Sequence, residues 1–187
     1  MRLVLGSASP RRREILAQLG LVFDVVPPAV DETPAPGEGP AVYLRRIVAA
    51  KLADVTCRVP KDTVVLAADT EVLIDGTVLG KPPGDDDART MLERLSGRAH
   101  EVVTVFAIRD HVEEVRTTVF FRALAKDEID AYVASGEGHD KAGAYAIQGR
   151  GAMLVSRIEG SYSNVVGLPA CEVWVALRRF LRDDGAV

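Results

Sequence analysis

The sequence is poor in the features that mark membrane-spanning, disulfide-bonded and zinc-binding proteins. None of the apolar runs in its 187 residues approaches the roughly 20 residues that a membrane helix needs. Cys57 and Cys171 form no CxxC pair, so we expect two reduced thiols and no disulfide. His100, His111 and His139 are scattered without the spacing of zinc ligands. The first residues also lack the length and small-residue cleavage site of a signal peptide, and we therefore expect a cytoplasmic protein.

A basic excess and the common nucleotide-binding motifs are also missing. The net charge of −4 argues against a surface for polymeric nucleic acid, because such domains usually carry a basic excess. It does not argue against a small anionic ligand, which needs only a local cluster of cations. The chain contains neither a GxxxxGKS/T segment nor a GxGxxG segment after a predicted strand. A P-loop and a Rossmann dinucleotide site are therefore not indicated.

The sequence does contain enough apolar residues for a folded core. Hydrophobic residues make up 48% of the chain, and its length suits one domain. Predicted strands alternate with predicted helices, and two segments have the pattern of antiparallel hairpins. We therefore predict an α/β fold in which helices flank a mixed β-sheet. A single domain over residues 1–187 is expected, with two lobes and an active-site cleft between them as the alternative.

The clearest element is a short apolar run, residues 64–68, that is followed directly by Asp69. The run is too short for a typical helix and rich in β-branched residues, so we predict a strand buried on both faces. Asp69 is then expected where this strand meets water, with a second strand beginning at once. Asp75-Gly76 suits a type I′ turn, which needs positive φ at both central positions. A carboxylate at a strand end, with Lys81 close behind the hairpin, suits a site for a metal and a phosphate.

The first predicted helix carries three arginines where cations are unusual. Ser9 suits its N-cap, and Pro10 suits its first position. Residues 11–13 are all arginine, although the helix dipole favours anions at that end. An anion such as a polyphosphate, bound by free backbone N–H groups and guanidinium groups, would explain this pattern. The alternative is a solvated face in which Glu14 pairs with these arginines.

A second predicted helix, residues 41–55, carries a lysine at the edge of its apolar face. Tyr43, Ile47 and Lys51 recur at a spacing of four beside the main apolar row of this helix. Lys51 therefore either points inward or snorkels to the surface. The loop before the helix carries neighbouring carboxylates at positions 31 and 32, which are either metal ligands or simply solvated.

The second half of the chain contains a glycine-rich segment, residues 136–151, between ordinary helices and strands. Its backbone amides can approach a ligand closely, and its polar handles are Lys141, Gln148 and Arg150. Glycine-rich loops also simply turn corners, so this motif is weak by itself. Three aspartates at positions 85–87 open a predicted helix and complement its dipole, which favours a capping role over a metal triad. Beyond the glycine-rich segment we predict a strand at 153–155, a loop or edge at 161–168 and a terminal helix from Pro169.

Five segments taken together resemble the Maf family, first named for inhibition of septum formation. In chain order they are SASPRRREIL at 7–16, ADT at 68–70, LGKP at 79–82, LSGRAHEVVT at 95–104 and DKAGAYAIQG at 140–149. The resemblance extends from about residue 3 to residue 180, and the segments stand in the family's order. It implies the mixed-sheet fold of the inosine triphosphate pyrophosphatases and a metal-dependent nucleoside triphosphate pyrophosphatase activity. It also implies a cytoplasmic location and a homodimer.

The resemblance assigns roles to individual residues. The family's catalytic aspartate matches Asp69, and its metal ligands match Glu32 and Asp69. Its substrate-binding groups match Ser7, Arg11, Arg12, Lys51 and Lys81. Asp31 stands where many members have a further glutamate, which leaves open which of the two neighbouring carboxylates reaches the metal.

The family divides by substrate at three positions. One branch hydrolyses dTTP, UTP and 5-substituted pyrimidine triphosphates, and its members have arginines after Ser-Pro, threonine after the catalytic aspartate and a late glutamine. The other branch acts on 7-methyl-GTP and tends to have tyrosine and glutamine at the first two of these positions. Arg11, Thr70 and Gln148 resemble the first branch. The implied role is house-cleaning of the nucleotide pool.

The expected mechanism combines a divalent cation with a cluster of positive side chains. Mg²⁺ or Mn²⁺, held by Glu32, Asp69 and triphosphate oxygens, would align a water for in-line attack on the α-phosphorus, releasing monophosphate and pyrophosphate. The clamp for the pyrophosphate would be Arg11, Arg12, Lys51 and Lys81. Asp69 either deprotonates the water or only binds the metal. The amide of Gln148 offers the donor and acceptor needed to read the N3–H and O4 edge of thymine or uracil.

Two other functions use the same residues. A non-catalytic nucleotide-binding regulator of cell division, which the family's name indicates, would use the pocket for recognition alone. The two carboxylates favour chemistry, because a pure triphosphate binder gains nothing from them unless a metal is present. A phosphomonoesterase would differ by releasing orthophosphate in place of pyrophosphate.

Overall fold

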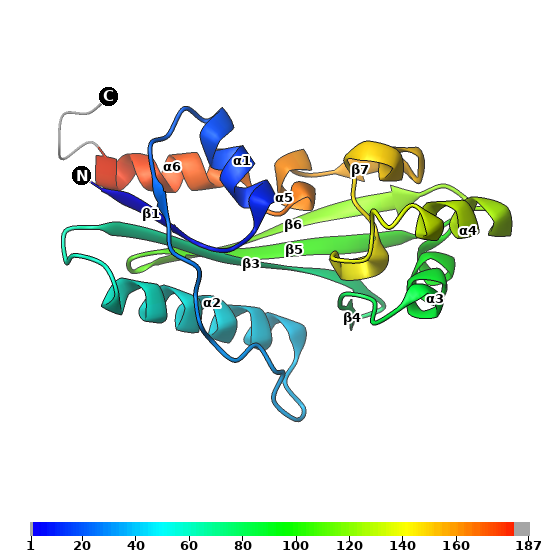
Figure 1. Cartoon of the computed structure of the whole chain (residues 1–187), viewed down its shortest axis with the longest axis horizontal. Helices are drawn as coiled ribbons and strands as arrows, with labels where there is room; N and C mark the ends of the chain where they lie inside the picture. The colour runs from blue at the N-terminus through cyan, green and yellow to red at the C-terminus, as the bar shows by residue number, and fades with distance from the viewer. Residues whose placement is uncertain (1, 182–187) are drawn as a thin grey trace. The chain divides into compact units, whose positions relative to one another are not determined.

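The computed structural model describes residues 2–181 and contains a seven-stranded mixed β-sheet (Figure 1). The strands hydrogen-bond in the order β2-β1-β3-β5-β6-β7, and β4 pairs with β3. β1 (Leu3–Gly6) is parallel both to β2 (Asp24–Val25) and to β3 (Val64–Ile74). β3 is antiparallel to β4 (Thr77–Leu79). Helices flank the sheet, so the predicted α/β fold class is confirmed.

The chain forms two compact units that share three strands. In the described chain, the first unit takes in the residues up to Asp69, residues 104–115 and the residues from Gly167 onward. The second unit takes in residues 70–103 and 116–166. β3, β5 and β6 contribute residues to both units. The single domain expected over the whole chain stays a prediction.

The first unit places helices on both sides of β1 and β3. α1 spans Pro10–Gln18, α2 spans Pro40–Cys57 and α6 spans Ala170–Leu181. In Figure 1, α2 lies on one side of these strands, and α1 and α6 lie on the other. A buried cluster joins β1, α2 and β3, and it consists of Val4, Val55 and Val65.

The two helices that the sequence marks most clearly form as predicted. Ser9 caps α1, since its Oγ accepts a hydrogen bond from the Arg12 backbone N–H at 3.4 Å, and Pro10 is the first helical residue. On α2, the row of Tyr43, Ile47 and Lys51 is buried, which confirms that Lys51 points inward. α2 is the longest described helix, with 18 residues. Neither α2 nor any other helix of residues 2–181 combines the length and apolar character of a membrane span.

β3 continues without interruption through Asp69, which corrects the expectation that a strand ends there. The strand has 11 residues, and Asp69 is only 9% exposed. The strand remains continuous because the buried carboxylate is matched by cations from α1 and α2, described below. The turn after it is as predicted, with φ values of 51° at Asp75 and 72° at Gly76.

The helices of the second unit pack against the parts of β3, β5 and β6 that belong to this unit. β5 spans Ala99–Ile108, β6 spans His111–Phe121 and β7, antiparallel to β6, spans Val155–Glu159. The helices are α3 (Asp85–Leu95), α4 (Lys126–Ala134) and α5 (Tyr162–Val166), with short 3-10 turns η1 (Ala142–Ala144) and η2 (Gly149–Met153). The core of the unit includes Leu92, Leu95, Val119, Tyr132 and Leu154.

Two sequence-based boundaries in this unit are wrong. Met153 and Leu154 belong to and follow η2, so the strand predicted at 153–155 begins only at Val155. Part of the predicted loop at 161–168 is the helix α5. Ser161 precedes this helix, and its Oγ accepts a hydrogen bond from the Asn164 N–H at 3.3 Å. The terminal helix begins at Ala170, directly after Pro169, as expected.

His100 is a buried histidine in the core of the second unit. It is 3% exposed, and its Nε2 lies 2.8 Å from the Tyr145 hydroxyl. Its ring meets the Phe121 ring edge-on, with centroids 5.1 Å apart. Burial lowers the pKa of His100 from 6.5 to about 4, because the charged imidazolium would lose its hydration.

We therefore expect His100 to make the protein sensitive to acid. Above pH 6.5 the His100 ring is neutral in both the folded and the unfolded protein. Between pH 6.5 and about 4, His100 is protonated in the unfolded chain but stays neutral in the folded protein, so the unfolded state is favoured. By pH 4 this costs about 3 kcal/mol of unfolding free energy. Urea unfolding at pH 7 and pH 4 measures the loss, which should shrink by about that amount in His100→Gln. The control His139→Gln, at an exposed histidine, should keep the full loss.

Candidate active site

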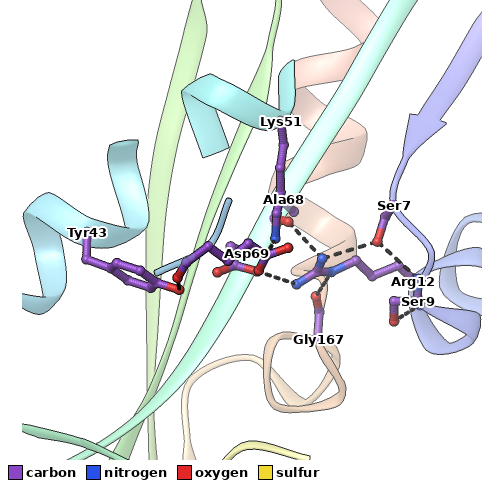
Figure 2. Close-up of polar contacts among 9 residues, drawn as sticks. Ser7, Ser9, Arg12, Tyr43, Lys51, Ala68, Asp69 and Gly167 are labelled. Carbon is purple, nitrogen blue, oxygen red and sulfur yellow. Dashed lines mark hydrogen bonds and ion pairs between the residues drawn. The ribbon is translucent and has the colours of Figure 1, made fainter. Parts of the chain in front are cut away.

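Four polar side chains of the first unit, three on α1, α2 and β3 and one at the β1–α1 junction, are buried together (Figure 2). Ser7 lies between β1 and α1, Arg12 lies on α1, Lys51 lies on α2 and Asp69 lies on β3. The exposed fractions of the whole residues are 5%, 8%, 5% and 9%, respectively. Charged side chains are almost never buried to this extent unless they are paired. The structure therefore joins four of the residues that the sequence selects.

The β1–α1 junction is held in shape by two serines. The Ser7 Oγ accepts hydrogen bonds from the Ser9 N–H at 3.2 Å and from Arg12 Nη1 at 3.3 Å. Ser9 in turn caps α1. The junction thus directs the second of the three arginines inward, whereas Arg13 is exposed.

Arg12 ties α1 to two distant backbone segments. Its Nη1 donates to the Ala68 carbonyl at 2.7 Å, and its Nε donates to the Gly167 carbonyl at 2.9 Å. Its Nη2 lies 4.0 Å from Asp69 Oδ1. The alternative of a solvated arginine face is wrong for this residue. The two hydrogen bonds come from different nitrogens of one planar guanidinium, a geometry that the single nitrogen of a lysine would not reproduce.

Lys51 bridges the two carboxylates that the sequence proposes as metal ligands. Its Nζ lies 2.9 Å from Asp69 Oδ1 and 2.9 Å from Glu32 Oε2. The Lys51 and Asp69 side chains are 6% and 12% exposed, whereas that of Glu32 is 51% exposed. The site therefore has a buried side, formed by Lys51 and Asp69, and a side open to solvent at Glu32.

The loop that carries Glu32 is fixed by its neighbours. The Tyr43 hydroxyl donates a hydrogen bond to the Glu32 carbonyl at 3.0 Å. Asp31 turns away, and its Oδ1 accepts from the Thr33 N–H at 2.9 Å and from the Thr33 hydroxyl at 2.6 Å. These bonds to Thr33 lower the pKa of the Asp31 carboxyl. Of the two neighbouring carboxylates, it is Glu32 that contacts Lys51.

The charges of the cluster balance. Two cations, Arg12 and Lys51, face two carboxylates, Asp69 and Glu32. Burial lowers the pKa of the Arg12 guanidinium, while the carboxylate of Asp69 acts in the opposite direction. A pairing of this kind offsets part of the cost of burying each charge. Catalytic groups are often held in such partly buried, oppositely charged surroundings.

Glu32 and Asp69 fit a hard divalent cation that takes its other ligands from a substrate. Lys51 keeps one oxygen of each carboxylate near the other, since both lie 2.9 Å from its nitrogen. Within residues 2–181, no group of three or more histidine, cysteine, aspartate or glutamate side chains could hold a metal by itself. Mg²⁺ usually binds through one or two carboxylates together with phosphate oxygens and water. The donor set therefore suits a cation that arrives with a triphosphate.

The remaining predicted residues lie on α1, on β3 and in the second unit. Arg11 is half-buried on α1 beside Arg12, and Thr70 is half-buried on β3 directly after Asp69. Lys81 follows β4 and Gln148 precedes η2, both exposed in the second unit. The substrate-binding and specificity roles of these residues stay predictions.

The site also uses groups that sequence reasoning did not select. The carbonyls of Ala68 and Gly167 hold Arg12, but backbone acceptors leave no mark in a sequence. Tyr43 holds the Glu32 loop, and it did leave a signal. Tyr43 precedes Lys51 by eight residues in the same helical row, so the spacing predicts that both side chains lie on the same face of α2.

Comparison with known proteins identifies relatives over nearly the whole chain. The family model described as Maf-like protein matches residues 2–180. A protein of Methylococcus capsulatus named dTTP/UTP pyrophosphatase is 50% identical over 182 residues, which cover 95% of this chain and 90% of that protein. A Myxococcus xanthus protein with the same name is 52% identical over 180 residues, covering 95% of this chain and 91% of that protein.

A solved structure shares less with this chain. It is a nucleoside-triphosphatase, also named dITP/XTP pyrophosphatase, from Mycobacterium abscessus, with 14% identity and a TM-score of 0.44 over 98% of this chain and 97% of that one. A similarity of this size supports no statement about fold or activity. The family model and the curated relatives are decisive, and they show that this chain belongs to the Maf family.

Proposed function

We propose that this protein hydrolyses dTTP and UTP to the nucleoside monophosphate and pyrophosphate. The observation that carries the proposal is the buried bridge of Lys51 between Asp69 and Glu32, with Arg12 beside it. Curated relatives at about 50% identity, named dTTP/UTP pyrophosphatase, support the substrate class. Removal of unwanted pyrimidine triphosphates from the nucleotide pool would be its role.

Asp69 is the residue to which we assign proton transfer. Its carboxylate accepts hydrogen bonds only, and it is held by Lys51 at 2.9 Å, so it can orient an attacking water and take its proton. Attack of the water on the α-phosphorus breaks its bond to the pyrophosphate group, and the products are the nucleoside monophosphate and pyrophosphate. The alternative, in which Asp69 serves only as a metal ligand, uses the same atoms.

The cations of the cluster position the triphosphate and balance its charge. Lys51 is a compact ammonium that contacts both carboxylates, so it holds their oxygens together while facing the phosphates. Ser7 and Arg12 fix the start of α1, whose N-terminal N–H groups favour an anion. Arg11 and Lys81 complete the proposed clamp for the departing pyrophosphate.

A divalent cation, Mg²⁺ or Mn²⁺, is part of the proposal. Glu32 and Asp69 would hold it, and when bound it would neutralise charge that develops on the phosphate oxygens. A cytoplasmic location and a homodimer are further predictions that come from the family resemblance alone.

Gln148 is the residue proposed to recognise the base, together with Arg11 and Thr70 as markers of the pyrimidine branch. Replacing it with alanine should lower the ratio of kcat/KM for dTTP to that for GTP by about 10- to 100-fold, since two hydrogen bonds to the base edge are lost. Steady-state kinetics with both nucleotides measure the ratio. Gln18→Ala, at the exposed end of α1, is the matched control and should leave the ratio unchanged. An unchanged ratio in Gln148→Ala would refute the assignment.

Product analysis tests the reaction itself. The purified protein is incubated with dTTP, UTP, CTP, GTP or 7-methyl-GTP, each with Mg²⁺ or with a chelator, and the products are separated by ion exchange. We expect metal-dependent release of pyrophosphate and monophosphate, fastest from dTTP or UTP. Orthophosphate as the first product would indicate a phosphomonoesterase.

The non-catalytic regulator of cell division is not favoured. The relatives are named as pyrophosphatases, and a protein that only bound a triphosphate would not need the buried carboxylate of Asp69. Binding of dTTP without turnover in the product analysis would revive this alternative.

A further inference from the structure

A carboxylate in the second unit closes the glycine-rich segment into a turn. Glu137 Oε2 accepts a hydrogen bond from the Arg150 N–H at 2.9 Å, and its Oε1 accepts one from the Gly151 N–H at 2.8 Å. Burial would raise the pKa of Glu137, but these two backbone bonds, together with a hydrogen bond from Tyr132 and the charge of Lys141, outweigh burial and lower the pKa. The carboxylate is thus held in its ionised, acceptor form at one end of the turn.

The other end of the turn is held by Tyr132 on α4. The Tyr132 hydroxyl donates to Glu137 Oε1 at 3.0 Å and accepts from the Ala146 N–H at 3.1 Å. Tyr132 is fully buried, and burial raises the pKa of its hydroxyl, which therefore remains a donor. Through this hydroxyl, Glu137 is connected to Ala146 as well as to Arg150 and Gly151.

The turn is closed tightly around these groups. Gly149 has a φ of 65°, and a Cβ there would lie 2.6 Å from Glu137 Oε2. A Cβ on Gly151 would collide with the Ala146 carbonyl. Glycine at both positions is what lets the chain fold back on the carboxylate.

The turn presents Gln148 to solvent. Ile147 is buried, 8% exposed, whereas Gln148 is exposed with extended backbone dihedrals of −85° and 164°. The bonds from Glu137 and Tyr132 flank Gln148 on both sides, at Ala146 and at Arg150 and Gly151. The conformation of Gln148 is therefore set by residues that do not themselves belong to the proposed site.

We propose that Glu137 is a positioning residue for base selection: by holding both ends of the 146–151 turn, it fixes Gln148 in the conformation that reads a pyrimidine. This inference rests on the proposed function, in which Gln148 contacts the base. Two hydrogen bonds to a base edge require an amide placed within a fraction of an ångström, and a small misplacement weakens both. Glu137 is not among the residues proposed to contact the phosphates, so its replacement should not affect the chemical step.

Three variants test the inference through the ratio of kcat/KM for dTTP to that for GTP. Glu137→Ala removes both direct hydrogen bonds to the turn, and we expect the ratio to fall about tenfold, through a higher KM for dTTP with little change in kcat. Glu137→Gln keeps the reach and one acceptor oxygen, so it should restore part of the ratio. Tyr132→Phe removes only the hydroxyl that connects Glu137 to Ala146, and it should lower the ratio even if Glu137→Ala fails to fold.

Glu128→Ala is the matched control. Glu128 is also a half-buried glutamate of the second unit that accepts a backbone N–H, from Ala125 at 2.9 Å, and pairs with Arg122 at 2.7 Å. Its loss should lower the melting temperature without changing the ratio. An equal fall of the ratio in Glu128→Ala would attribute the effect to general destabilisation and overturn the inference.

A double variant separates this inference from the proposed function. In the Gln148→Ala background, Glu137→Ala should lower the ratio no further, because both changes remove the same contact. If Gln148→Ala lowers the ratio and Glu137→Ala does not, the inference is wrong and the proposed function stands. If Gln148→Ala itself leaves the ratio unchanged, the proposed base recognition fails, and the inference fails with it.

Discussion

Replacing Asp69 with asparagine should lower kcat for dTTP by about 10²- to 10⁴-fold, the usual contribution of a positioned acid or base. The side chain keeps its shape, but the amide can neither take a proton from water nor offer two anionic oxygens. The Lys51 ammonium remains paired with Glu32 at 2.9 Å, so the cluster keeps a partner for its cation. Steady-state kinetics and thermal unfolding of the same sample separate loss of chemistry from loss of fold.

The matched control for this variant is Asp75→Asn. Asp75 is an exposed aspartate in the β3–β4 turn, and asparagine tolerates its positive φ of 51°. It should retain wild-type kcat. Near-normal turnover in Asp69→Asn would contradict the assignment of Asp69 as the catalytic carboxylate.

Replacing Lys51 with methionine should lower the unfolding free energy by about 3 kcal/mol, the lower end of the range for breaking a buried ion pair. The change leaves Asp69 buried with Arg12 Nη2 4.0 Å away as its remaining cation in the cluster. The loss stays at the lower end because the Glu32 side chain is 51% exposed and can be hydrated. Urea unfolding of both proteins at pH 7 measures the difference.

Lys126→Met is the control for the loss of a lysine ion pair. The Lys126 side chain is 81% exposed, so its i,i+4 pair with Asp130 contributes little to stability. This variant should unfold like the wild type. Equal unfolding free energies for Lys51→Met and the wild type would show that the bridge between the carboxylates does not stabilise the fold.

Much of the fold could be predicted from the sequence, because several local signals have only one good structural solution. Ser9 followed by Pro10 marks a helix start, and Asp75-Gly76 marks a turn with positive φ. Where signals are weak, the prediction failed. The five-residue helix α5 is too short to show a helical period, and only Ser161 three residues before Asn164 marks its cap.

Only part of the candidate site could be predicted from the sequence. The helical row on α2 correctly predicts that Lys51 points inward, because spacing alone decides which face a residue takes. The burial of Asp69 within a continuous strand could not be predicted, since an aspartate normally marks the end of a buried run. What makes it possible is a contact between residues far apart in sequence, from Lys51 to Asp69 and from Arg12 to the Ala68 carbonyl.

The central claim is that water attacks the α-phosphorus of a pyrimidine triphosphate at the Asp69 site. Hydrolysis of dTTP in water enriched in oxygen-18, followed by mass spectrometry of both products, tests it most directly. The account predicts one heavy oxygen in the thymidine monophosphate and none in the pyrophosphate, with at least about 100-fold less labelled product from Asp69→Asn in the same time. Label in the pyrophosphate, or orthophosphate as the first labelled product, would contradict it.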